Sequence, residues 1–406
     1  MLTTSVNPIA IAPSRIRSEI QALQLQLVEW RRQLHQKPEM GFKEHLTAEL
    51  IGQKLQAWEI PHQTGIAHTG IVATIESGKP GPVLAIRADM DALPIQEENN
   101  VPYRSQHNGV MHACGHDGHT AIALGTAYYL AQHPTEFAGT VKIIFQPAEE
   151  GPGGAKPMIE AGVLQNPTVD AIIGLHLWNN LPLGTVGVKS GALMAAVEEF
   201  KCTIFGKGGH GAIPQQTIDA VVVSAQVVNA LQTIVARNVD PLQSAVVTIG
   251  QLHAGTAFNI IADTARLSGT VRYFNPAFDG YFGKRMEQVI AGVCQSHGAS
   301  YELDYWRHYP ALINDAAMAE LVRAVAETVV ETPAGVVPEC QTMGAEDMSF
   351  FLQEVPGCYF FLGSANPDRD LAYPHHHPRF DFDEAALGMG VEMFVRCIEK
   401  FCQPAT

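Results

Sequence analysis

The chain has 406 residues, 46% hydrophobic and 17% charged, and its 41 acidic residues against 26 basic ones give a net charge of −15. That acidic balance, without a Lys/Arg-rich stripe or an apolar run as long as a bilayer span, argues against nucleic-acid and membrane partners. Seven scattered cysteines do not predict a disulfide framework, and residues 1–13 do not resemble a secretory signal, so we expect a cytoplasmic protein.

The first part of the chain alternates between helical and extended patterns. Apolar residues recur at helical spacing over residues 14–35, and a second helix is expected over residues 44–58. Short apolar runs predict buried strands at residues 70–75, 83–87, 141–145 and 171–175. Helical stretches at residues 120–132 and 155–161 lie between them. This alternation predicts an α/β fold with a helix-covered, mostly parallel sheet.

Chemically reactive side chains follow three of these strands. Asp89 and Asp91 follow one strand, Glu149 and Glu150 follow another, and His176 ends a third. Because ligands bind beyond the carboxyl ends of strands in such sheets, this placement predicts a site there.

The pattern changes after residue 191. We expect strands over residues 198–205, 246–250 and 266–273, and helices over residues 217–236 and 279–297. Two strand–helix units of this kind predict a smaller, two-layer α+β insert. From about residue 306 the chain is expected to return to the first domain, because its later histidines would otherwise lie far from the other candidate ligands. The predicted organisation is one domain in two segments, residues 1–194 and 306–406, with an inserted domain at residues 195–305.

The run MHACGHD contains the strongest chemical signal, with Cys114 and His116 two residues apart on a glycine turn. A thiolate and an imidazole at this spacing can bind one borderline-soft metal ion, although a buried cysteine beside a turn-capping histidine produces the same pattern. Asp117 can cap the helix that follows. His112 and His119, which flank the pair, are expected to be structural or to orient ligands.

Glu149 and Glu150 come directly after an apolar strand and before a glycine-rich turn. Most adjacent glutamates belong to a solvated acidic loop, but neighbouring side chains in extended backbone point in opposite directions. One carboxylate can then bind a metal ion while the other faces a water molecule, as hydrolytic metal sites require. With Cys114, His116, His176 and the triplet 375–377, these donors are enough for two metal ions about 3.5–4 Å apart.

Ordered motifs along nearly the full chain carry a family resemblance. They are WRRQLHQKPE (30–39), IRADMDALP (86–94), MHACGHD (111–117), FQPAEEG (145–151), GKGGH (206–210) and HPRFDF (377–382). The chain resembles the metal-dependent amidohydrolase and peptidase clan that includes aminoacylases. Within that clan it resembles the branch of N-acyl-amino-acid amidohydrolases, hippurate hydrolases and plant auxin–amino-acid conjugate hydrolases.

The resemblance implies that the two-segment domain is catalytic and that it binds two divalent metal ions, Zn or Mn, with Co or Ni also tolerated. The implied ligands are Cys114, His116, Glu150, His176 and His376. His376 is selected by its position two residues before a proline, and His375 and His377 remain alternatives. The resemblance also makes Glu149 the general base. Asp89 stands where other branches keep a ligating histidine, and Asp91 is expected to orient a ligand.

For the insert, the resemblance implies a lid and dimerisation domain, and therefore a homodimer or larger homo-oligomer. His210 would stabilise an oxyanion in a neighbouring subunit's site. Asn259 and Arg272 occupy substrate-binding positions, where an arginine can hold a carboxylate in a bidentate fork. An exposed strand position is the alternative for Arg272. Gln215 departs from the family pattern, in which many relatives have a histidine.

The expected activity is hydrolysis of the amide bond of a small N-acyl amino acid to a carboxylate and a free amino acid. A dipeptidase or carboxypeptidase of the same clan is the nearest alternative. A non-catalytic binding protein is disfavoured by the intact Glu149, and a thiol hydrolase with Cys114 as nucleophile by the other candidate ligands. The acyl group, the amino-acid side chain, the metal and the choice between dimer and tetramer stay open.

Overall fold

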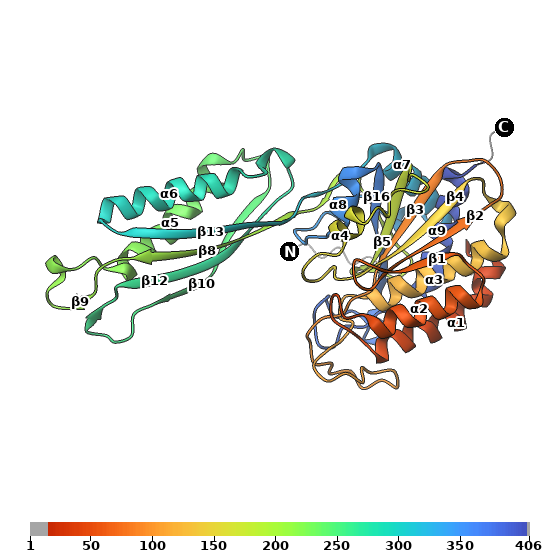
Figure 1. Ribbon diagram of the computed structural model, residues 1–406, viewed down its shortest axis with the longest axis horizontal. Coiled ribbons are helices and arrows are strands. Elements are labelled where there is room, and N and C mark those ends of the chain that lie inside the picture. The colour runs from red at the N-terminus through yellow and green to blue at the C-terminus, as the bar shows by residue number, and fades with distance from the viewer. Residues whose placement is uncertain (1–14, 404–406) are drawn as a thin grey trace. The chain divides into compact units, whose positions relative to one another are not determined.

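The computed structural model describes residues 15–403, so the expectation for residues 1–13 lies outside the described part. The described chain forms two compact units (Figure 1). The first contains the chain up to Gly191, Ile313–Cys340 and the chain from Phe350, and the second contains Ala192–Leu312 and Gln341–Ser349. The predicted insert, residues 195–305, falls within the second unit.

The helices form largely where apolar residues recur at helical spacing. Their bounds are α1 (Ser18–Gln36), α2 (His45–Ala57), α3 (His116–Gln132), α4 (Ala155–Glu160), α5 (Ala220–Asn238), α6 (Tyr281–His297), α7 (Ala316–Val329), α8 (Met348–Glu354) and α9 (Ala386–Phe401). The six helices that the sequence predicts, α1 to α6, all form and agree with their expected bounds to within about four residues.

A mixed eight-stranded sheet forms the centre of the first unit, in the order β1-β2-β4-β3-β5-β16-β6-β15. The strands are β1 (His62–Ile66), β2 (Gly70–Glu76), β3 (Val83–Asp89), β4 (Thr140–Gln146), β5 (Ala171–Pro182), β6 (Val186–Gly187), β15 (Val336–Val337) and β16 (Gly357–Ala365). The adjoining strands β4, β3, β5 and β16 are parallel. The sequence predicts the first three of them and their parallel arrangement, but it does not predict β16. The pairs β1–β2, β2–β4 and β16–β6 are antiparallel. Only a short turn joins β1 to β2, and such a turn permits antiparallel pairing alone.

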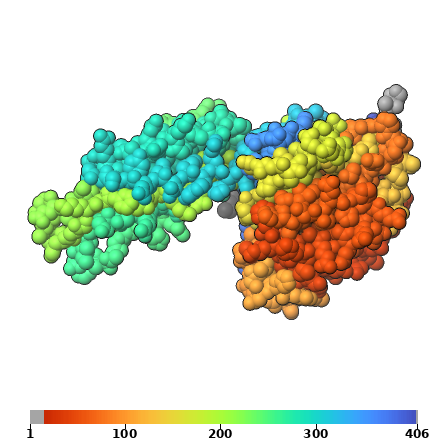
Figure 2. All heavy atoms as spheres, viewed as in Figure 1, coloured from red at the N-terminus to blue at the C-terminus, as the bar shows by residue number. Residues whose placement is uncertain are grey.

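Helices cover this sheet. α3, α7 and α9 pack against its strands, and α1 packs against α3 and α9. The central strands β3, β4, β5 and β16 are almost wholly buried, which explains why they are nearly continuous apolar runs in the sequence. In Figure 2 the N-terminal residues, coloured red to orange, form much of the visible surface of this unit.

The second unit is a two-layer α+β structure, as predicted. Its antiparallel sheet has the order β10-β12-β8-β13, formed by β8 (Ala196–Phe205), β10 (Ala245–Ala254), β12 (Thr264–Tyr273) and β13 (Ser300–Tyr309). α5 and α6 pack together against this sheet (Figure 1). The short strands β9 (Gly209–His210) and β11 (Ile260–Ile261) pair with each other. β7 (Gly191–Met194) and β14 (Leu312–Asn314) lie where the chain passes between the units.

Among the described residues, α5 is the one helix long and apolar enough to cross a membrane by length and composition alone. From the sequence we expected no uninterrupted apolar run as long as a bilayer span, and Ser224, Gln226 and Asn229 do interrupt the apolar residues of α5. The buried residues of α5, which include Val223, Val227 and Leu231, recur at helical spacing, and the helix packs on strands of the four-stranded sheet. A packed core helix has this same pattern.

Candidate metal centre

The start of α3 places Cys114 and His116 at the carboxyl edge of the central strands. Gly115, between them, has φ 90° and caps the helix in the left-handed conformation that glycine adopts without a steric penalty. The prediction that Asp117 caps α3 is wrong. Asp117 lies in the first turn of the helix, and its Oδ2 accepts hydrogen bonds from Arg31 Nε and His35 Nδ1, both at 2.7 Å.

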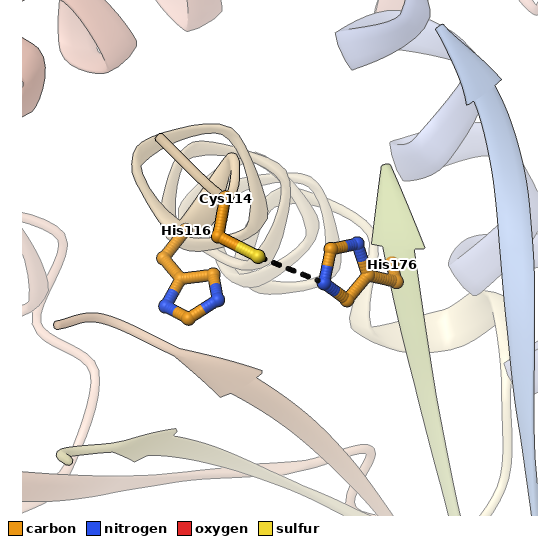
Figure 3. Close-up of side chains that lie close together, drawn as sticks. All are labelled: Cys114, His116 and His176. Atoms are coloured by element: carbon orange, nitrogen blue, oxygen red, sulfur yellow. Dashed lines mark hydrogen bonds between the residues drawn. The ribbon is translucent and has the colours of Figure 1, made fainter. Parts of the chain in front are cut away.

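The predicted ligands of the first unit lie together. Cys114 Sγ is 3.5 Å from His176 Nε2, and both residues form a buried group with His116 (Figure 3). Within each of three groups of side chains, all donor atoms lie within 4.8 Å of one another. These groups are Cys114–His116–His176, Cys114–Glu150–His376 and His116–Glu149–Glu150. Because the groups share members, we treat these six residues as one donor cluster.

The three histidines of the triplet differ in their contacts. His376 Nε2 lies 3.1 Å from Glu150 Oε1 in the donor cluster. His375 Nε2 donates to the Leu177 carbonyl oxygen at 2.9 Å, and its ring stacks on Trp178. His377 Nδ1 accepts the backbone N–H of residue 379 at 3.0 Å. The geometry therefore favours His376 over its two neighbours.

His176 is held as a neutral imidazole with a lone pair toward Cys114. Its Nδ1 donates to the Leu177 carbonyl oxygen at 2.6 Å, which leaves Nε2 unprotonated and facing the thiol. Burial, together with the neighbouring His119 and His375, lowers the pKa of His176 well below its ordinary value. A neutral imidazole with one fixed N–H is the form that binds metals.

Asp91 contacts two parts of the cluster. Its Oδ1 and Oδ2 accept the backbone N–H groups of Glu149 and Glu150, each at 3.0 Å, and its Oδ1 lies 3.3 Å from His116 Nδ1. Burial lowers the pKa of His116, but the carboxylates of Asp89 and Asp91 outweigh burial and raise it to about 10. His116 Nε2 is buried and has no hydrogen-bond partner among the described residues.

Asp89 and His119 also lie beside His116, but other contacts occupy them. His119 Nδ1 donates to Asp89 at 2.6 Å, and His119 Nε2 accepts the Leu177 N–H at 2.8 Å. Asp89 accepts a second bond from Arg87 Nη1 at 2.6 Å. With both ring nitrogens in use, His119 has no lone pair left for a metal ion. We did not predict the contact between Arg87 and Asp89 from the sequence. A single arginine in an apolar, buried strand indicates that a carboxylate lies beside it, because a buried charge needs a partner.

The donor cluster fits divalent metal ions. Burial and the carboxylates of Glu150 and Glu149 raise the pKa of the Cys114 thiol well above its ordinary value, and a bound cation is the charge that reverses such a shift. Sulfur, imidazole and carboxylate donors together suit Zn and its first-row neighbours. Within the cluster, His116 Nε2 accepts or donates no hydrogen bond among the described residues and lies 4.0 Å from Glu150 Oε1.

His210, Asn259 and Arg272 belong to the second unit. β9 places His210 opposite Ile260, and the Gly211 N–H donates to the Asn259 carbonyl oxygen at 2.9 Å. His210 is exposed, and its Nδ1 accepts the Ala212 N–H at 3.0 Å, so in the neutral ring Nε2 carries the proton.

Arg272 lies on β12 and is partly buried. It donates to Thr270 Oγ1 and to the Val271 carbonyl oxygen, and it forms no ion pair with a carboxylate among residues 15–403. Burial lowers the pKa of Arg272. A guanidinium in this position retains donors for an anionic ligand.

The fold and the donor cluster together define a hydrolase of the metal-dependent class. Residues 85–400 match the model of Peptidase family M20/M25/M40, and the chain belongs to that family.

Curated relatives cover most of the chain. An N-acyl-L-amino acid amidohydrolase of Geobacillus stearothermophilus is 44% identical over 300 residues, 74% of this chain and 80% of that protein. An N-acetylcysteine deacetylase of Bacillus subtilis (strain 168) is 40% identical over 378 residues, 92% of this chain and 96% of that one. Thermostable carboxypeptidase 2 of Saccharolobus solfataricus is 39% identical over 383 residues, 93% and 95% of the two chains.

Solved structures share the fold. The Bacillus subtilis YxeP protein, described as a dinuclear metal-binding peptidase of the M20 family, has a TM-score of 0.82 at 36% identity and covers 95% of this chain and 100% of its own. A structure from methicillin-resistant Staphylococcus aureus has a TM-score of 0.88 at 37% identity, with 97% and 100% of the two chains covered. The chain is thus a hydrolase of the M20 family.

Proposed function

We propose that this chain hydrolyses the amide bond of small N-acyl amino acids, releasing a carboxylate and a free amino acid. The observation that carries the proposal is the pair Glu149 and Glu150, held by Asp91 within a buried set of Cys and His donors. The names of two relatives, an N-acyl-L-amino acid amidohydrolase and an N-acetylcysteine deacetylase, support this substrate class.

We infer that two divalent metal ions, Zn or Mn with Co or Ni as further candidates, bind to Cys114, His116, Glu150, His176 and His376. When bound, the ions would polarise the amide carbonyl and lower the pKa of a water molecule. The fit of the donor cluster supports this inference, as does the description of the YxeP relative as dinuclear.

Glu149 serves as the general base in this proposal. Its carboxylate removes a proton from the attacking water and returns it to the leaving nitrogen. Asp91 accepts a hydrogen bond from the Glu149 N–H, and this bond fixes the backbone position from which the Glu149 side chain extends. His210, with its proton on Nε2, donates to the oxyanion that develops on the amide oxygen.

We also propose a homo-oligomer, at least a dimer, joined through the inserted domain. The Gly206 N–H donates to the Asp263 carbonyl oxygen, which ties the turn of His210 to the Thr264 end of β12. Arg272 lies eight residues further along this strand, roughly 26 Å at about 3.3 Å per residue. One small substrate cannot contact both ends of one insert. In this proposal two copies contribute to each site, one with Arg272 and the other with His210 and Asn259.

We place the protein in the cytoplasm, without nucleic-acid or membrane partners. The proposal that Cys114 binds metal supports this location, because a reducing compartment keeps a thiolate ligand available.

The first test is hydrolysis of N-acetyl, N-benzoyl and indole-acetyl amino acids, and of free dipeptides, by metal-stripped protein before and after Zn or Mn is restored. We expect activity on the acylated amino acids to disappear on stripping and to return with about two metal ions per chain. Faster cleavage of the dipeptides would favour the peptidase alternative. The name of one relative, a thermostable carboxypeptidase, supports that alternative. Bound metal without any amide turnover would contradict the proposed activity, and chelator-insensitive turnover would contradict the metal dependence.

A further inference from the structure

The turn that carries Glu149 and Glu150 contains a strained residue. Ala148 has φ 56°, in the left-handed region that a residue with a Cβ atom rarely adopts, and it is fully buried. Such a conformation persists only where surrounding contacts hold it. The contacts around Ala148 therefore determine the directions in which the side chains of Glu149 and Glu150 point.

Two buried carboxylates hold three consecutive backbone N–H groups of this turn. The Ala148 N–H donates to Glu44 Oε1 at 2.9 Å, and the next two N–H groups donate to the two oxygens of Asp91. Gly41 leaves room for this arrangement, because a Cβ atom there would lie 2.9 Å from the Ala148 Cβ. Asp91 thus holds the two glutamates, and Glu44 holds the strained residue before them.

Glu44 is the N-cap residue of α2, but its side chain makes no capping hydrogen bond to that helix. The N–H groups of Leu46 and Thr47, in the first turn of α2, donate to Glu39 Oε2 at 2.8 and 3.0 Å. The second oxygen of Glu44 instead accepts the Thr69 hydroxyl at 2.6 Å. Glu44 is fully buried, and a buried carboxylate is tolerated only when hydrogen bonds compensate for its lost hydration. Its two bonds join the turn before β2 to the turn after β4.

We propose that Glu44 is a positioning residue: by accepting the Ala148 N–H it holds the left-handed turn that aims Glu149 and Glu150. This inference rests on the proposed function, in which Glu149 is the base and Glu150 a metal ligand. What matters is a hydrogen-bond acceptor at the correct distance, since the Ala148 N–H that Glu44 binds is a neutral group.

The test compares Glu44→Met, Glu44→Gln and Glu44→Asp. Methionine fills the space without an acceptor of comparable strength, and aspartate keeps the charge on a shorter side chain. Glutamine keeps the length: its amide oxygen accepts the Ala148 N–H and its NH₂ group donates to Thr69. We measure kcat and KM for N-acetyl amino acids at saturating Co²⁺, and the Kd of Co²⁺ for the stripped protein.

We expect Glu44→Met and Glu44→Asp to lower kcat about 10- to 100-fold with little change in KM, and to weaken Co²⁺ binding about 10-fold. Glu44→Gln should stay within about threefold of the wild type in both. Glu39→Gln is the matched control, because it weakens the cap of α2 and lowers Tm but leaves kcat and Co²⁺ affinity unchanged.

Wild-type kcat and Co²⁺ affinity in both Glu44→Met and Glu44→Asp would overturn the proposal. So would a Glu44→Gln variant as impaired as Glu44→Asp, since charge would then matter more than the acceptor. If Glu44→Met does not fold, the comparison of Glu44→Asp with Glu44→Gln still decides. If the wild type hydrolyses no amide, the proposed function fails, while Co²⁺ affinity across the same variants still tests the role of Glu44.

Discussion

Glu149 is the residue on which the proposed chemistry depends most directly. Glu149→Gln keeps the size of the side chain and its backbone bond to Asp91, but an amide cannot take up a proton. We expect kcat to fall about 10²- to 10⁴-fold while the metal content stays at the wild-type value. The measurement is turnover of an N-acetyl amino acid with metal counted in the same sample. Normal turnover by this variant would exclude Glu149 as the base.

His35 supplies a pH-dependent contribution to stability at the residue scale. Its Nδ1 lies 2.7 Å from Asp117 Oδ2 and its Nε2 lies 3.3 Å from Glu97 Oε1. Burial and the Arg31 charge lower the pKa of His35, but the two carboxylates outweigh them and raise it to about 9. Because the folded-state pKa lies above the unfolded value of about 6.5, the charged ring stabilises the fold fully below pH 6.5. That contribution is lost as the pH rises through about 9.

We therefore expect the difference in Tm between the wild type and His35→Gln to shrink between about pH 6.5 and 9.5. Thermal unfolding of both proteins at half-unit pH steps measures it. A difference in Tm that stays constant over this range would show that His35 is not charged in the fold.

At the scale of elements, α4 can begin against the end of β4 only because residue 154 is glycine. A Cβ atom on Gly154 would lie 1.8 Å from the Pro147 carbonyl oxygen, a backbone atom that cannot turn aside as a side chain can. We expect Gly154→Ala to cost about 1–3 kcal/mol of unfolding free energy. It should also lower kcat, because the displaced Pro147 precedes the turn of Glu149 and Glu150.

Gly292→Ala is the matched control for this substitution. Gly292 is an exposed residue of α6, and a Cβ atom there would have no neighbour within 4 Å. Alanine should stabilise that helix by about 0.8–1 kcal/mol without an effect on kcat. Urea unfolding and activity assays on both variants test the pair. A Gly154→Ala protein with wild-type stability and turnover would contradict the close packing of α4.

At the scale of the whole molecule, the proposed dimer requires an apolar surface on the second unit. Phe258 is fully exposed there, and Ile260, Val221 and Val222 are about half exposed. Exposed apolar side chains in this number suggest a protein contact. We expect the wild type to sediment as a dimer or larger species, and Phe258→Asp to shift it toward monomer.

The same substitution should lower kcat and leave the metal content unchanged, because separated copies no longer exchange His210 and Asn259. Leu25→Asp, at an exposed apolar residue of α1 in the first unit, is the control and should change neither property. A monomeric wild type with full activity would contradict the shared site.

The sequence by itself determined the helices α1 to α6, the buried strands β2 to β5 and the placement of reactive residues after strands, because local periodicity and turn residues report which face of an element is buried. No helix or strand was predicted beyond residue 306, so α7, α8, α9 and the buried strand β16 were known only from the structure. The sequence also did not predict β1, which forms the antiparallel edge of the large sheet, because this strand is polar and mostly exposed and has no alternation of apolar residues. β13 also went unpredicted within the insert, because its residues are mostly exposed and it pairs with β8 across about a hundred residues of chain.

Within the donor cluster, the tertiary structure alone decided the contacts of individual side chains. The family resemblance selects His376 but leaves His375 and His377 as alternatives. The contacts separate the first two, because His375 binds the Leu177 carbonyl oxygen and His376 lies beside the Glu150 carboxylate. The sequence predicted that Asp117 caps a helix, but in the structure its carboxylate accepts hydrogen bonds from Arg31 and His35. Periodicity predicts which residues are buried, but the partner of a buried polar atom depends on long-range packing, which no local pattern contains.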